Sequence, residues 1–130
     1  MSTKQFTIIG SFFANGRFLD NNYLYFDLPD SELLQIEKLI SEEFNIQKFK
    51  KVKYKKNYTN LYYSSEYLKK FLRNYHLDSF NKLSKEEFEY LVKGFGKQIT
   101  INSIEILNNL CLLLDLHNIS YTKNNMTLLI

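Results

Sequence analysis

The sequence repeats itself at an offset of 73 residues, and this repetition restricts the architectures that the chain can adopt. Similar residues occupy corresponding positions: Leu28, Glu32, Leu33, Leu34, Asn45 and Ile46 match Ile101, Glu105, Ile106, Leu107, Asn118 and Ile119. A repeat of this kind indicates two similar units that bury their apolar faces together. With 130 residues, one Pro and four Gly, the chain has little linker composition. We therefore expect a single domain, 1–130, with repeat one at about 4–76 and a truncated repeat two at about 84–130.

Hydrophobic periodicity in repeat one predicts alternating helices and hairpins. The expected elements are a helix at 8–16, a hairpin of 17–20 and 23–28 around Asn21-Asn22, a helix from Pro29-Asp30 to Phe44, strands at 47–55 and 58–63, and a helix that begins at Ser65. In the second helix, Leu33, Ile36 and Ile40 have the spacing of a buried face. Glu32 and Glu37 of the same helix are expected to face water.

Repeat two begins with Ser84 and Glu87, which have the spacing of a capping box and predict a helix through Phe95. Gly96-Lys97-Gln98 then leads directly into a strand at 99–101, so the first hairpin strand of this repeat is missing. The remaining expected elements are a helix from Ser103 to His117 and a closing hairpin of 119–123 and 126–130 around Asn124-Asn125. Repeat two is therefore a shortened copy of repeat one.

Residues 8–16, IIGSFFANG, match the motif of the LAGLIDADG family of homing endonucleases and intron maturases, with Asn15 in place of the last acid. The chain also resembles this family in the order of its elements. The resemblance implies an α+β fold in which two repeats with antiparallel sheets are related by a pseudo-twofold axis between central motif helices. Gly10, Ala14 and Gly94 are the expected contact between these helices, because small residues let backbones approach closely.

The same resemblance implies where catalysis would occur. Family members use acids at the ends of the two motif helices, where carboxylates hold metal ions that activate water at a phosphate. This chain offers Asn15 at the first end and Lys97 and Gln98 at the second, and the nearest acids, Asp20 and Glu105, lie beyond the helix ends. A neutral amide and a lysine are poor ligands for a hard cation. We therefore predict no catalytic residue, no metal site, no cofactor and no enzymatic activity.

Other kinds of site find little support in the sequence. The single cysteine, Cys111, lies in an apolar run and is expected in the core, and the two histidines lack metal-ligand spacing. His76, Asp78 and Ser79 are neighbours in sequence, which is not the geometry of a catalytic triad. No apolar run approaches the roughly 20 residues of a membrane span, so we expect no membrane partner.

Positive charge is concentrated in one predicted strand. Residues 47–56, QKFKKVKYKK, carry six lysines and no acid, whereas the remaining chain, with 11 basic and 14 acidic residues, carries −3. Because alternate side chains of a strand share a face, three lysines should project together: Lys51, Lys53 and Lys55. Val52 and Tyr54 should then point the other way. Lys48 and Lys50 would join the lysine face only if a bulge or kink shifts the register near residue 50.

In the resembled family, this part of the sheet lies on nucleic acid, where lysines contact phosphates and make affinity depend on salt. The predicted nucleic-acid-binding residues are Arg17, Lys48, Lys50, Lys51, Lys53, Lys55, Lys56, Tyr58, Lys97 and Lys123. Tyrosines interleaved with the lysines also suit stacking on unpaired bases. The alternative is that a lysine-rich edge hairpin only prevents strand-to-strand aggregation. Six lysines without an acid favour nucleic-acid contact.

The amino-acid composition suggests an origin. Lys outnumbers Arg by 15 to 2, and Asn, Tyr, Phe and Ile are abundant, all residues with AT-rich codons. We therefore expect a mitochondrial, organelle-encoded protein. Our hypothesis is an inactive LAGLIDADG-type protein that binds structured RNA, namely rRNA, as a structural component of a mitochondrial ribosome, with ribosomal proteins as neighbours. Two alternatives stay open: a divergent homing endonuclease, and an intron maturase or DNA-binding regulator.

Overall fold

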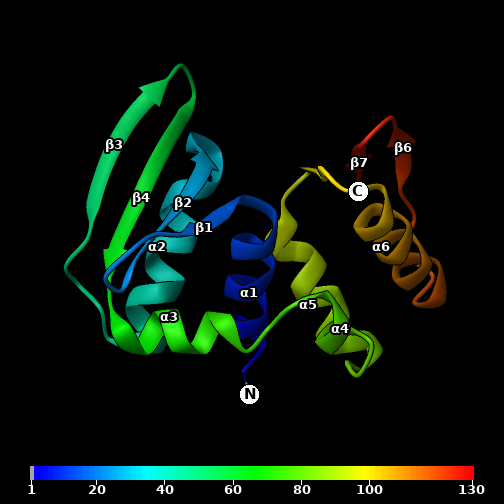
Figure 1. Cartoon of the computed structure of the whole chain (residues 1–130), viewed down its shortest axis with the longest axis horizontal. Helices are drawn as coiled ribbons and strands as arrows, with labels where there is room; N and C mark the ends of the chain where they lie inside the picture. Colours follow the sequence, from blue (N-terminus) through cyan, green and yellow to red (C-terminus); the bar gives the residue numbers. More distant parts are fainter. Residues whose placement is uncertain (1) are drawn as a thin grey trace.

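Two antiparallel sheets lie on either side of a central pair of helices, α1 (Thr3–Asn15) and α5 (Lys85–Phe95), in the computed structural model (Figure 1). The structure describes residues 2–130, apart from the side chain of Tyr54. Within residues 2–130, every helix is too short or too polar to span a lipid bilayer. The predicted fold class, α+β with antiparallel sheets and central motif helices, is confirmed.

Repeat one forms a four-stranded sheet in the order β1-β2-β4-β3. Its elements are β1 (Gly16–Phe18), β2 (Tyr23–Pro29), α2 (Asp30–Phe44), β3 (Lys50–Lys55), β4 (Tyr58–Ser64) and α3 (Glu66–Arg73). Asn21 and Asn22, with φ of 58° and 65°, provide the two left-handed residues that a tight turn between β1 and β2 requires. One face of the sheet is buried under α1, α2 and α3 through Leu24, Phe26 and Leu28 of β2. We call this the helix-side face and the opposite one the open face.

Repeat two forms a three-stranded sheet in the order β5-β7-β6. Its elements are α5, β5 (Gln98–Thr100), α6 (Ile104–Leu116), β6 (Thr122–Asn124) and β7 (Thr127–Leu129). Ser84 and Glu87 form the predicted capping box, and the chain passes from α5 into β5 without a strand between them. The closing hairpin turns at Asn125-Met126, one residue later than predicted, because Asn124 still pairs with Thr127.

A short helix, α4 (Leu77–Phe80), which was not predicted from the sequence, connects the repeats. The hydroxyl of Ser79 donates to the carbonyl of His76, 2.6 Å away, and accepts from the backbone N–H of the same residue at 3.1 Å. The side chain of Phe80 is buried beside Phe13 of α1, with ring centroids 5.2 Å apart. This packing fixes the connection to the core, which runs continuously through both repeats.

The motif helices α1 and α5 touch at two glycines. A Cβ atom placed on Gly10 would lie 1.9 Å from the carbonyl oxygen of Leu91, and one on Gly94 would lie 2.1 Å from that of Thr7. Ala14 lies nearer the end of α1, partly buried against the core. The two backbones are therefore in direct contact, which places the ends of α1 and α5 side by side between the sheets (Figure 1).

Candidate nucleic-acid interface

Four residues form a row across the open face of the four-stranded sheet, one from each strand. Arg17 lies opposite Tyr25, Tyr25 opposite Tyr62, and Tyr62 opposite Lys50. Directly opposed residues project from the same side of a sheet, so all four side chains point away from the helices. The rings of Tyr25 and Tyr62 pack with their centroids 5.2 Å apart. We call this set the open-face row.

A second basic and aromatic pair lies further along the same face. Lys55 is opposite Tyr58, and its ammonium group lies 4.4 Å from the centre of the Tyr58 ring. Between this pair and the open-face row, Asp27, Asn60 and Val52 occupy adjacent positions on β2, β4 and β3. The open face of repeat one therefore combines aromatic rings with cations at both ends.

Two of the predicted lysines point the wrong way for this surface. Lys51 lies opposite buried Leu61 and Lys53 opposite buried Thr59, so both project from the helix-side face. Their ammonium groups pair with acids of α2: Lys51 with Glu37 at 3.2 Å, and Lys53 with Asp30 at 2.5 Å. The prediction that Lys51, Lys53 and Lys55 share one face is therefore wrong.

A bulge explains why Lys55 differs from Lys53. The register between β3 and β4 shifts between Lys53 and Lys55, and a bulge of this kind changes the face to which the following side chains point. From the sequence alone, we considered a shift of the strand register near residue 50 instead. With this register, Lys50 reaches the open face without any irregularity, because it pairs with Tyr62. The predicted position of Tyr54 lies outside the described side chains.

The other predicted contacts are dispersed. Lys48 precedes β3, Lys56 lies in the turn between β3 and β4, and Lys97 follows α5, all three exposed. Lys123 lies opposite buried Leu128, so its side chain projects from the buried, helix-side face of the second sheet and not from its open face. The structure thus groups Arg17, Lys50, Lys55 and Tyr58 on one face but does not bring Lys123 to it.

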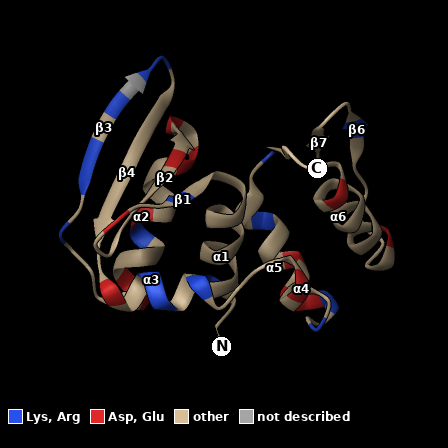
Figure 2. Cartoon of the chain, in the orientation of Figure 1, with Lys and Arg blue, Asp and Glu red and all other residues tan. Residues whose placement is uncertain are grey.

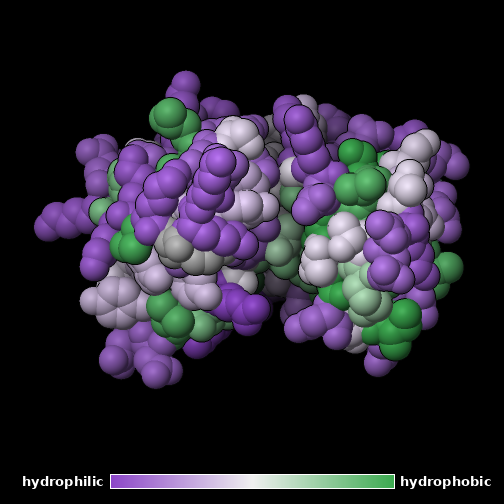
Figure 3. All heavy atoms as spheres, turned by 90° about the horizontal axis from the view of Figure 1, so that it is seen from above, coloured by the Kyte–Doolittle hydropathy of each residue, from purple (hydrophilic) through white to green (hydrophobic). Residues whose placement is uncertain are grey.

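The open face of the second sheet differs sharply from that of the first. Its positions are uncharged: Gln98, Thr100, Thr122, Asn124, Thr127 and Leu129. Figure 2 shows basic residues along most of β3, at the opposite end of the molecule from this sheet. From above, hydrophilic side chains cover the side of repeat one and hydrophobic ones gather over repeat two, with a hollow between them (Figure 3). Of the two open faces, only that of repeat one therefore carries charged residues.

The ends of the motif helices border a hollow of about 740 Å³, which we call the foot hollow. Asn15, Lys97 and Gln98 line it, as does Glu32 from the first turn of α2. Glu32 does not face water as predicted, because its carboxylate lies against Gly96: a Cβ there would be 2.4 Å from Oε1. Burial raises the pKa of the Glu32 carboxyl, and the nearby charge of Lys97 opposes this.

Glu32 is the residue of this region that the sequence did not single out. It lies far from the motif in sequence, and the amphipathic pattern of its helix predicted that it would be exposed to water. The sequence signal that could have pointed to Glu32 is the glycine at position 96. A glycine permits the positive φ seen there, 80°, and leaves room for a neighbouring side chain. Glu37 also differs from the prediction: its side chain is only 19% exposed and is paired with Lys51.

The residues around the foot hollow do not fit a divalent cation. A hard cation takes several anionic or carbonyl oxygen ligands. Within residues 2–130, no group of three or more His, Cys, Asp or Glu is placed to hold a metal ion. Asn15 contributes a neutral amide, and Lys97 places a positive charge beside Glu32. With Glu32 as the one acid among the described residues of its lining, the foot hollow lacks the anionic ligands of a metal centre.

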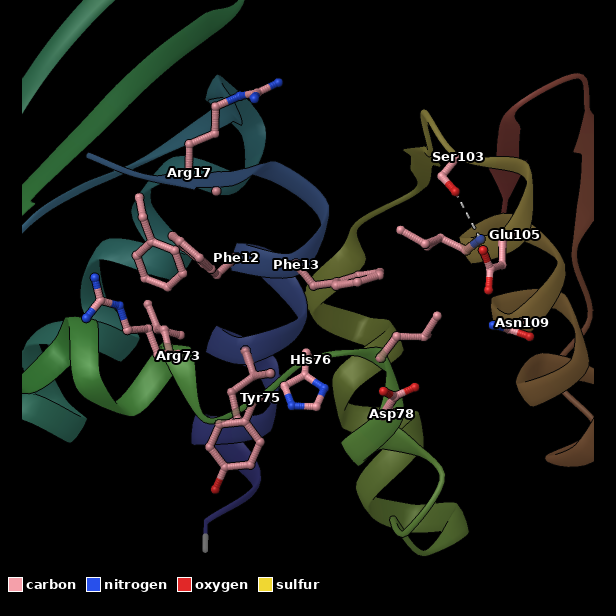
Figure 4. Close-up of a pocket in the computed structure, with 16 residues that line it drawn as sticks. Phe12, Phe13, Arg17, Arg73, Tyr75, His76, Asp78, Ser103, Glu105 and Asn109 are labelled. Atoms are coloured by element: carbon pink, nitrogen blue, oxygen red, sulfur yellow. Dashed lines mark hydrogen bonds between the residues drawn. The ribbon is translucent and has the colours of Figure 1, made fainter. Parts of the chain in front are cut away.

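A second hollow, of about 680 Å³, lies between α1 and α6. Its floor is apolar, with Phe12 and Phe13 of α1, and charged groups from both repeats surround it (Figure 4). His76 and Asp78 both line this hollow. Ser79 is not available as their nucleophile because its hydroxyl caps α4. Glu105 lies at the start of α6, where Ser103 caps the helix through the N–H of Ile106.

Solved structures with the same fold provide the comparison with known proteins. The homing endonuclease I-DmoI in complex with DNA and calcium is 14% identical, with a TM-score of 0.67, covering 98% of this chain and 82% of that one. A variant of I-DmoI with its target DNA and magnesium is 16% identical, with a TM-score of 0.68, covering 98% and 88%. No model of a protein family matches the sequence, and no curated protein is significantly similar to it.

Proposed function

We propose that this chain, which has the fold of a LAGLIDADG homing endonuclease, binds nucleic acid on the open face of its four-stranded sheet without cleaving it. The observation that carries this proposal is the open-face row, in which Arg17 and Lys50 flank two packed tyrosines. Cations at the two ends hold phosphates, and the rings between them offer a surface for bases or sugars. I-DmoI itself has been solved in complex with DNA.

We further propose that the ligand is structured RNA. Of the two open faces, that of repeat one carries basic residues, whereas that of the second sheet carries no charge. A long duplex held by both sheets would need phosphate contacts on each. A compact, prefolded RNA needs contacts on one side only, which matches the asymmetry of this chain.

The proposed lack of cleavage rests on the ends of the motif helices. Hydrolysis of a phosphodiester by this fold requires metal ions that activate water and neutralise charge on the phosphate. By the motif match, Asn15 replaces the last acid of the first motif, and Lys97 and Gln98 lie where the second motif helix would carry its acid. All three residues line the foot hollow. A lysine at that place attracts phosphate but repels the cation that would act on it.

Removing one positive charge from each face of β3 in turn tests the binding surface. Lys50→Gln should weaken RNA binding and reduce the slope of log affinity against log salt by about 1, because one phosphate contact is lost. Lys53→Gln is the matched control, since this lysine lies on the same strand but points to the helix side. Both are measured by fluorescence anisotropy at several salt concentrations. Equal effects of the two variants would refute the assignment of faces.

A divergent homing endonuclease is the second candidate, favoured by the fold and by the carboxylate of Glu32 at the foot hollow. Incubating the purified protein with magnesium and supercoiled DNA should leave the DNA intact if our proposal is correct. Nicking would establish the enzyme instead, and Asn15→Asp should then increase the rate. An intron maturase or DNA-binding regulator, the third candidate, would bind intron RNA or DNA without cutting it.

We propose the mitochondrial ribosome as the location of this RNA, on the basis of the many residues in the chain whose codons are AT-rich. Native protein isolated from its cells at low salt should sediment with ribosomal subunits and bring rRNA and ribosomal proteins with it, identified by sequencing and mass spectrometry. A protein that sediments freely, or with intron RNA, would contradict this location without affecting the RNA-binding surface.

A further inference from the structure

A hollow of about 640 Å³ opens where β3 separates from β4, and we call it the edge hollow. The last pair between these strands is Lys50 with Tyr62, whereas β4 continues to Ser64. The two final residues of β4 are therefore not covered by β3. The hollow formed at this point is lined by Tyr23, Lys48, Phe49, Lys50, Val52, Tyr62, Tyr63 and Ser64.

Aromatic rings form much of this lining, and several of them are held in place. Tyr62 packs on Tyr25, and its hydroxyl oxygen accepts a hydrogen bond from the amide of Asn60 at 3.4 Å. The rings of Phe49 and Tyr63 lie 5.9 Å apart, and the Tyr63 side chain is buried. Tyr23, in contrast, is 48% exposed. A planar ligand would therefore meet fixed rings and one ring free to adjust.

The charges around the edge hollow have one sign. Lys48 and Lys50 line it, both exposed, and its lining contains no acid. Ion pairs occupy Lys51 and Lys53 on the other side of the strand. None of the ion pairs seen within residues 2–130 involves Lys48 or Lys50. Two cations beside an aromatic hollow match the combination of a phosphate and a base.

We propose that the edge hollow binds one unpaired base of the RNA, with Lys48 and Lys50 on the phosphates beside it. This inference rests on the proposed function and makes it more specific, because it selects RNA with a bulged or single-stranded nucleotide. A base inside a duplex is stacked and paired, so it cannot reach a hollow of this kind. Lys50 also belongs to the open-face row, so the paired part of the same RNA lies across that row.

Three hairpin RNAs of equal length test the inference: one fully paired, one with a single-nucleotide bulge, and one with an abasic bulge. The protein should bind the bulged RNA about tenfold more tightly than the other two, since stacking of one base has about this effect. The abasic RNA has the same backbone, so it separates recognition of the base from recognition of a bend. Affinities are measured by anisotropy at one fixed salt concentration.

Variants of Tyr23 test whether this residue causes the preference for the bulged RNA. Tyr23→Leu should remove most of it and Tyr23→Phe should retain it, because phenylalanine keeps the ring. Tyr67→Leu is the matched control, since this tyrosine is 68% exposed on α3 and lies outside the hollow. Circular dichroism checks that each variant is folded.

The outcomes separate this inference from the proposed function. Equal binding of the three RNAs would overturn the base site and leave the open-face surface intact. If the unmodified protein bound none of the three RNAs, the proposed function itself would be overturned. A free nucleoside monophosphate that binds as tightly as the bulged RNA would replace RNA by a small ligand and also overturn the inference.

Discussion

The contact between the motif helices makes a quantitative prediction about the substitution Gly10→Ala. The new Cβ would lie 1.9 Å from the carbonyl oxygen of Leu91, whereas atoms in ordinary contact are near 3.5 Å apart. The helices would have to separate by roughly 1.5 Å, because the obstacle is backbone and cannot rotate away. Both faces of this contact belong to the continuous core. The separation therefore disturbs packing along the whole length of α1.

The expected net cost is about 2 kcal/mol. Overpacking a core costs about 1–3 kcal/mol, and a backbone obstacle falls at the upper end. Alanine in place of glycine inside a helix recovers about 1 kcal/mol. For a chain of this length, we expect the melting temperature to fall by about 6–10 °C. The free energy itself is measured by urea unfolding with the slope held common to both proteins.

Two further variants make the test sharper. Glu89→Ala, an exposed position of α5, should change stability by less than about 0.5 kcal/mol. Gly94→Ala should cost about as much as Gly10→Ala, since its Cβ would lie 2.1 Å from the carbonyl oxygen of Thr7. One separation relieves both contacts, so the double variant should cost less than the sum of the two. If Gly10→Ala were as stable as the unmodified protein, the direct backbone contact would be refuted.

Three smaller predictions concern helix ends and one ion pair. Ser84→Ala should destabilise the protein by about 1 kcal/mol, measured by urea unfolding, because the hydroxyl caps the N–H of Glu87 at 3.1 Å. Asn45 ends α2 with φ of 53°, so Asn45→Ala should cost about 1 kcal/mol while Asn45→Gly stays within about half of that. Hydrogen bonds from Lys53 and then Thr59 hold the pKa of Asp30 below its ordinary value near 3.8. The ionised form is therefore favoured in the folded protein, and its stabilising effect is present above that pH and lost as the pH falls through the lowered pKa. Asp30→Asn should make the melting temperature depend less on pH below about pH 4; an unchanged pH profile would contradict this.

Most of the fold follows from local sequence signals. Ser84 with Glu87 marks the start of α5, and the Asn21-Asn22 pair marks the first hairpin, since each pattern has a specific hydrogen-bond or dihedral requirement. The motif at 8–16 adds the long-range information that local patterns lack, namely that α1 meets α5 at Gly10 and Gly94. The short helix α4 was not predicted, because four residues are too few to show a period.

The candidate surface was predicted less well, for a physical reason. Alternation along β3 correctly separates Lys51 and Lys53 from Lys50, but alternation alone does not say which set faces outward. The pairing of Lys51 with Leu61 decides that question, and pairing register depends on residues that are distant in sequence. The bulge before Lys55 then changes the face once more. Neither effect has a local signature in a lysine-rich strand.

The meeting of α1 with α5 has a consequence for how the protein is made. α1 is complete at Asn15, but its partner helix ends only at Phe95, 80 residues later. At synthesis rates of about 5–20 residues per second, the apolar side of α1 waits roughly 4–16 s for the surface that covers it. During that interval, α1 can pack only on the elements of repeat one. The nascent chain is therefore most vulnerable to aggregation before repeat two emerges, and slower translation would prolong this exposure.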